Sequence, residues 1–168
     1  MNRTSETAPA GVKNRTTTER TSDRELVVTR TFDAPPRIVF EAWTRPELFK
    51  RWWVPRSMGM SLLTCEMDVR AGGTYRFVFG VGGSTAMEVF GKYLEVTPNS
   101  RLVWTNEEGD EGGAVTTLTF EEKGSQTLLV KHDLYPSKEA LDGELASGAA
   151  DGLPEQLEQL DELLITLE

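Results

Sequence analysis

The sequence predicts an α+β fold in which a curved antiparallel sheet of about seven strands packs around one long C-terminal helix. Residues 60–134 consist of short apolar-rich runs separated by Gly-Gly, Pro-Asn and Lys-Gly-Ser breaks. Such short links favour an antiparallel meander over parallel crossovers. Residues 153–167 repeat leucine at helical spacing. A sheet of this kind must bury its apolar face, and the last helix is the only long amphipathic one expected.

Residues 1–22 are expected to form a disordered tail ahead of a single folded domain over residues 23–168. The tail contains only four apolar residues, Met1, Ala8, Ala10 and Val12. It therefore holds neither a secretory signal segment nor a membrane span. A single cysteine cannot form an internal disulfide, so the cytoplasm is the expected location.

The charge balance excludes one class of partner. The chain has 18 Lys and Arg residues against 27 Asp and Glu residues, a formal net charge of -9. A field of this sign repels phosphate backbones, so nucleic acid is not an expected partner. One cysteine and one histidine cannot build an ordinary Cys/His zinc site. We therefore expect no metal and no cofactor.

The first strand and two short helices are expected before the meander. Leu26, Val28 and Phe32 alternate with more polar residues, as in a half-buried strand that ends at the Pro35-Pro36 pair. Helical spacing follows over residues 38–53. Thr44 and Glu47 fit a capping box for the second helix, and Pro55 ends it.

Three aromatic residues are expected on one face of a central strand. Tyr75, Phe77 and Phe79 alternate with Arg76 and Val78. They either line a cavity or fill a packed core, and the pattern is compatible with both. Residues 136–152 are expected to be loose, and the acidic residues of the last helix, including Glu155, Glu158 and Glu162, are expected to face water.

Several segments in order resemble one superfamily. They are "FDAPPRIVFEAWTRPELFKRWWVP", "DVRAGGTYRFVF", "FGKYLEVTPNSRLVWT" and the leucine-striped last helix. Together they cover about residues 24–168 and are similar to the START-like, birch-pollen-allergen-like helix-grip domains (SRPBCC), in the branch named after the activator of the heat-shock chaperone ATPase. The resemblance implies a sheet wrapped around the terminal helix with an apolar cavity between them. Where the family often has Gly-Trp at the start of that helix, this chain has Gly152-Leu153.

The candidate ligand-binding residues are mainly large and apolar. His132 is the exception: it shares a predicted strand face with Leu128, Val130 and Leu134, where it is either a ligand contact or a histidine satisfied by a structural partner. No partner group for catalysis is recognisable beside it, so no catalytic residue is assigned. The candidates are Trp53, Met58, Phe77, Phe79, Met87, His132 and Leu157.

Three functions compete at this point. The first is a binding module that holds a small hydrophobic or amphipathic molecule between sheet and helix. The second is a protein-interaction domain that forms a homodimer or associates with a chaperone. The third is a cyclase-like or hydrolase-like enzyme acting on hydrophobic substrates, which ranks last because no orienting partner is found for a catalytic group.

Overall fold

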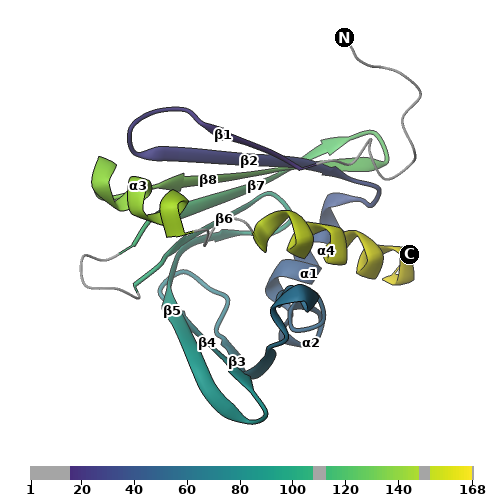
Figure 1. Cartoon of the computed structure of the whole chain (residues 1–168). Helices are drawn as coiled ribbons and strands as arrows, with labels where there is room; N and C mark the ends of the chain where they lie inside the picture. The colour runs from purple at the N-terminus through teal and green to yellow at the C-terminus, as the bar shows by residue number, and fades with distance from the viewer. Residues whose placement is uncertain (1–15, 108–112, 148–151, 168) are drawn as a thin grey trace.

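The computed structural model describes residues 16–107, 113–147 and 152–167, which form one eight-stranded antiparallel sheet with helices on one face (Figure 1). The sheet order is β1-β2-β8-β7-β6-β5-β4-β3. The predicted α+β class and curved sheet are confirmed, with one strand more than expected. The strands are β1 (Thr17–Arg20), β2 (Glu25–Phe32), β3 (Ser61–Met67), β4 (Thr74–Val81), β5 (Ser84–Thr97), β6 (Arg101–Thr105), β7 (Val115–Lys123) and β8 (Gln126–Leu134).

The additional strand, β1, corrects the expected boundary of the tail. Residues 1–15 lie outside the described residues, but Thr17–Arg20 pairs with β2, with Thr17 opposite Thr29 and Arg20 opposite Leu26. All four residues of β1 are exposed. Backbone pairing rather than apolar burial therefore holds this strand at the sheet edge, and a hydrophobic pattern could not reveal it.

Two short helices connect β2 to β3, as predicted: α1 (Pro36–Thr44) and α2 (Pro46–Phe49). A 3-10 turn, η2, follows at Arg56–Met58. The predicted capping box is wrong, because Arg45 is the N-cap of α2 and makes no side-chain cap. The Thr44 hydroxyl instead donates to the Phe40 carbonyl within α1, at 2.9 Å.

The expected loose stretch 136–152 contains a helix, α3 (Lys138–Ser147). Its first turn is capped because the Ala140 N–H donates to the Ser137 hydroxyl, at 3.0 Å. Only Leu141 is buried, and Gly143 lies in the middle of the helix. The apolar stripe that usually identifies a helix is therefore missing.

The terminal helix α4 (Leu153–Leu167) packs into the sheet as predicted. Figure 1 shows α4 crossing in front of the sheet beside α1, on the face that also carries α2. Its buried leucines join a core that includes Val28 and Phe32 of β2 and Leu129 of β8. They are Leu157, Leu160, Leu163 and Leu164.

The sheet bends most in its second half. Register shifts occur between Leu62 and Thr64 in β3 and between Tyr93 and Glu95 in β5. Such irregularities increase local twist and bend a strand. Because β5 pairs first with β4 and then with β6, it joins the two halves of the sheet across this bend.

Candidate functional site

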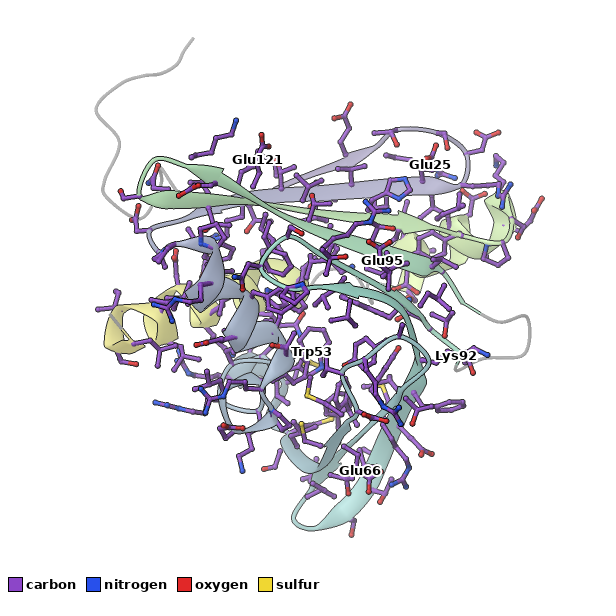
Figure 2. All side chains as sticks on the ribbon, turned by 180° about the vertical axis from the view of Figure 1, so that it is seen from behind. Glu25, Trp53, Glu66, Lys92, Glu95 and Glu121 are labelled. Atoms are coloured by element: carbon purple, nitrogen blue, oxygen red, sulfur yellow. The ribbon has the colours of Figure 1, made fainter. Side chains whose placement is uncertain are left out.

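A cavity of about 590 Å³ lies inside the fold. Its volume falls within the range of small-molecule sites in proteins, about 300–1,000 Å³. The wall is built from α1, α2, the loop after α2, the strands β3 to β8, α3 and α4, which contributes Gln156. In Figure 2 the labelled Trp53 lies inside the molecule, among the side chains between the helices and β3–β5.

One end of the cavity is aromatic and rich in methionine. The Trp53 ring stacks on the Phe49 ring at 4.7 Å, and Phe49 stacks on Phe77 at 4.9 Å. Trp43 closes the cluster, with its ring 5.9 Å from that of Trp53. Flat rings and flexible thioethers present a large, adaptable apolar surface. The methionines that line the cavity are Met58, Met60, Met67 and Met87.

The two adjacent tryptophans have different positions. Trp52 is completely buried, and its indole Nε1 donates to the Ala42 carbonyl at 3.0 Å. Trp53 is only partly buried and lines the cavity. Trp52 is therefore a core residue, whereas Trp53 is available to a bound molecule.

Helix α4 holds the loop that carries Trp53. Gln159 is 5% exposed, and its amide nitrogen donates to the Val54 carbonyl while its amide oxygen accepts the Arg56 N–H, both at 2.9 Å. Gln156 donates to the Trp53 carbonyl. These contacts position Trp53, Val54 and the following residues at the cavity wall.

None of the three glutamates of α4 is buried, as the sequence predicts, but two of them also contact the turn η2. Glu155 accepts the Ser57 N–H at 3.0 Å and the Ser57 hydroxyl at 2.5 Å. The Ser57 contacts lower the pKa of Glu155 below its ordinary value. Glu162 pairs with Arg56 at 2.6 Å. Of the three acids, Glu158 alone is exposed without a hydrogen bond or ion pair to described residues.

The opposite end of the cavity is polar and buried. The Lys131 ammonium lies 2.7 Å from the Asp133 carboxylate, and their side chains are 17% and 5% exposed. The Thr116 hydroxyl donates to Asp133 at 2.5 Å, and the Asn106 amide donates to Thr116 at 2.9 Å. The charges of Lys131 and Asp133 therefore compensate each other within a hydrogen-bonded network.

Helix α3 adds Glu144 to this polar end. Burial raises the pKa of the Glu144 carboxyl, Lys131 opposes that rise, and Asp133 reinforces it. The Glu144 carboxyl makes no hydrogen bond to any described residue. Burial also raises the pKa of Tyr135, with Asp133 and Glu144 adding to the effect. Glu144 is thus partly desolvated and lacks a hydrogen-bond donor.

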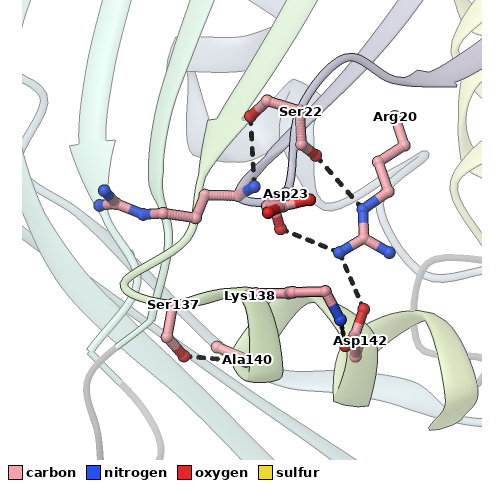
Figure 3. Close-up of polar contacts among 8 residues, drawn as sticks. Arg20, Ser22, Asp23, Ser137, Lys138, Ala140 and Asp142 are labelled. Carbon is pink, nitrogen blue, oxygen red and sulfur yellow. Dashed lines mark hydrogen bonds and ion pairs between the residues drawn. The ribbon is translucent and has the colours of Figure 1, made fainter.

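Contacts with the β1–β2 turn hold α3 over the cavity (Figure 3). Asp142 pairs with both Arg20 and Lys138, at 2.8 Å in each case. The preceding residue, Leu141, is fully buried. The unexpected strand β1 is therefore linked through Arg20 to the unexpected helix α3, which adds Ala140 and Glu144 to the cavity wall.

The structure brings five of the seven predicted ligand residues to the cavity wall: Trp53, Met58, Phe77, Phe79 and Met87. Leu157 does not line it but is buried in the core. His132 lies on the other face of β8, where its Nε2 is 2.8 Å from a Glu25 carboxylate oxygen. This contact lowers the pKa of Glu25. Any ligand contact by His132 inside this cavity is therefore excluded by its position.

The sequence pattern of β8 does not show which face of the strand points inward, and His132 lies on the face that points away from the cavity. Thr127, Leu129 and Asp133 are the buried residues of one face, whereas Val130 and His132 are half-buried on the other. Both faces carry apolar side chains, so alternation alone could not identify the inner one. For the same reason Lys131 and Asp133 were not predicted to line the cavity. Glu144 was not predicted because no helix was expected over residues 138–147.

Two features are absent from the described residues. None of the helices over 16–107, 113–147 and 152–167 is long and apolar enough to cross a bilayer. In the same ranges no three His, Cys, Asp or Glu side chains are grouped so that they could hold a metal ion.

Comparison with known proteins gives one family match and many structural ones. Residues 33–165 match the family described as activator of Hsp90 ATPase homolog 1-like protein. A crystal structure from Rhodobacter sphaeroides is 27% identical, with a TM-score of 0.81, covering 91% of this chain and 99% of that one. A structure from Nitrosomonas europaea is 24% identical, with a TM-score of 0.77, covering 88% and 97%. Among curated proteins, none matches the sequence significantly.

Proposed function

Because the chain belongs to the activator of Hsp90 ATPase homolog 1-like family, whose fold is known for ligand binding, we propose that it binds a small amphipathic molecule. The observation that carries this proposal is the cavity of about 590 Å³ with an aromatic, methionine-rich end and a polar end. Burial of an apolar molecule of moderate size against such a wall is favourable, at roughly 25 cal/mol per Å² of apolar surface.

The arrangement supports binding more strongly than catalysis. Asp133 already accepts hydrogen bonds from Thr116 and Lys131. These bonds stabilise its carboxylate and make it a weak general base. Cys65 does not line the cavity, and burial raises the pKa of its thiol, which keeps it protonated and weakly nucleophilic. A carrier or sensor of an amphipathic molecule requires only the shape and the few polar contacts described here.

The proposal is tested by titration with Nile red, a neutral dye whose fluorescence rises in apolar surroundings. We expect saturable binding with one site per chain. The Phe77→Trp variant should weaken binding by about tenfold, because a larger ring occupies the cavity. Ile165→Trp is the matched control, since Ile165 is 77% exposed on α4, and it should bind the dye as the parent protein does.

Two outcomes would count against ligand binding. One is a linear, unsaturable fluorescence increase, which indicates non-specific adsorption. The other is equal weakening by both tryptophan variants. Native mass spectrometry of the protein purified without added ligand gives an independent readout, since a retained molecule appears as an added mass that denaturation removes.

Self-association is a second candidate, favoured by apolar side chains exposed on β3, β4 and β5. Leu63, Val81 and Leu94 are 39%, 59% and 48% exposed, and β3 is an open edge of the sheet. Light scattering coupled to gel filtration decides the question. A molar mass twice the chain mass that falls to the monomer value on Val81→Glu supports it, and a monomer at all concentrations excludes it.

A further inference from the structure

The polar end of the cavity carries an acid without a hydrogen-bond donor. Three charged side chains line the described part of the wall: Lys131, Asp133 and Glu144. Lys131 and Asp133 form a close pair at 2.7 Å. The Glu144 carboxyl has no hydrogen bond to a described residue, lines the same cavity and lies near enough to feel the charges of that pair. With Glu144 ionised, the formal charge of this end is -1.

Two phenol groups that line the cavity also lack hydrogen-bond partners among the described residues. Tyr93 is only 5% exposed, lines the cavity, and its hydroxyl makes no hydrogen bond to any described residue. The same is true of the hydroxyl of the half-buried Tyr135. Buried polar groups are normally hydrogen-bonded, because an unmade bond costs about 1–3 kcal/mol. Unpaired groups that face an open cavity therefore indicate where a bound molecule makes its polar contacts.

From this geometry we infer that the occupant carries a hydrogen-bond-donating head group, an amine or a hydroxyl, which it places at Glu144 while its apolar body lies against Phe49, Trp53 and Phe77. This inference rests on the proposed function and names the class of ligand. A carboxylate or phosphate head would meet the acidic Glu144, and Lys131, the one cation along the described part of the wall, is already paired with Asp133.

The charge of the protein acts in the same direction. A formal net charge of -9 favours the approach of cationic molecules and opposes that of anionic ones. Inside the cavity, a protonated amine that donates to an ionised carboxylate forms a charge-assisted hydrogen bond, the strongest kind available at this end. A hydroxyl head can donate to Glu144 and accept from Tyr135, which lies near that carboxyl.

The test uses three competitors that share a naphthyl body and differ in the head: 2-(2-naphthyl)ethylamine, 2-(2-naphthyl)ethanol and 2-naphthylacetate. Each displaces Nile red from the intact protein at neutral pH. We expect the amine and the alcohol to compete at concentrations at least about tenfold lower than the acetate. Glu144→Gln should weaken the amine about tenfold and change the alcohol by less than about threefold.

Glu139→Gln is the matched control, because Glu139 lies on α3 but is exposed and does not line the cavity. It should leave all three competitors unchanged. Tyr135→Phe is a second, independent variant that should weaken the alcohol severalfold while leaving the fold intact.

The inference is overturned if the acetate competes as well as the amine, or if Glu144→Gln leaves the ratio of amine to acetate unchanged. Either result leaves the proposed function standing as long as Nile red itself binds saturably. Absence of saturable Nile red binding, in contrast, removes the proposed function and this inference with it.

Discussion

The side-chain amide of Gln159 donates to the backbone carbonyl of Trp52, with 2.9 Å between Nε2 and the oxygen. This contact joins α4 to the segment after α2, 107 residues earlier in the chain. The same amide nitrogen also donates to the Val54 carbonyl, and the amide oxygen accepts the Arg56 N–H. One buried side chain therefore satisfies three backbone groups of the loop that walls the cavity.

Replacement of Gln159 by leucine should lower the free energy of unfolding by about 2–4 kcal/mol. The change keeps an apolar body of similar size but leaves buried backbone groups without partners, and each unmade bond costs about 1–3 kcal/mol. Urea unfolding followed by tryptophan fluorescence measures the difference. Glu158→Ala, at an exposed position on the same helix, should shift stability by less than about 0.5 kcal/mol. Equal effects of both variants would show that the amide contacts contribute nothing.

The two adjacent tryptophans should respond differently to the same substitution. Trp52→Phe removes the indole bond to Ala42 from a fully buried site and should cost about 1–3 kcal/mol of stability. Trp53→Phe should cost less stability but weaken Nile red binding severalfold, because Trp53 lines the cavity. Parallel thermal melts and dye titrations separate the two effects. Reversed roles would contradict the assignment of Trp52 to the core.

Two glycines should respond with opposite signs to an alanine substitution. A Cβ at Gly91 would lie 2.0 Å from the Thr105 carbonyl oxygen and 2.8 Å from the Tyr75 hydroxyl, so Gly91→Ala should destabilise the protein by about 2 kcal/mol or more through forced separation of β5 from β6. A Cβ at Gly143 meets nothing within 4 Å. Gly143→Ala should therefore stabilise α3 by about 0.5–1 kcal/mol. Thermal unfolding of both variants tests the pair, and a stabilised Gly91→Ala protein would refute the close approach.

Stability should depend on pH through Glu144. Burial raises the pKa of this carboxyl in the folded state, with Asp133 reinforcing and Lys131 opposing the rise. In the pH range above the ordinary glutamate pKa of 4.5, the folded state therefore holds a proton that the unfolded state has lost. Stability falls as pH rises through this window. Glu144→Gln removes that dependence, so its stability relative to the parent should increase from pH 4 to pH 8.

Urea unfolding at pH 4, 6 and 8 measures the difference between the Glu144→Gln variant and the parent. The exposed Glu139→Gln variant serves as control and should track the parent at each pH. A difference that shrinks as pH rises would mean that Glu144 is better solvated, or better paired, when ionised.

The aromatic residues of the cavity wall were predictable in part. Large apolar residues at every second position of a strand share one face, and that face must line or fill an interior. Phe77 and Phe79 follow from that rule, and Trp53 follows from its place after a short helix. The sequence does not show which of the adjacent Trp52 and Trp53 rings enters the core. That choice depends on how α4 holds the segment that carries them.

The sequence by itself determined the α+β class, the order of the two short helices, the meander and the last helix, and three of the four leucines that α4 buries, because these depend on local periodicity; Leu163 lies outside the predicted stripe. Only the tertiary structure decided the inner face of β8, since Leu129 and Val130 are apolar on opposite faces. It likewise decided that Lys131 and Asp133 meet Glu144, because their juxtaposition depends on how α3 docks. Local patterns report which residues avoid water, but charge placement inside a cavity depends on contacts between distant segments.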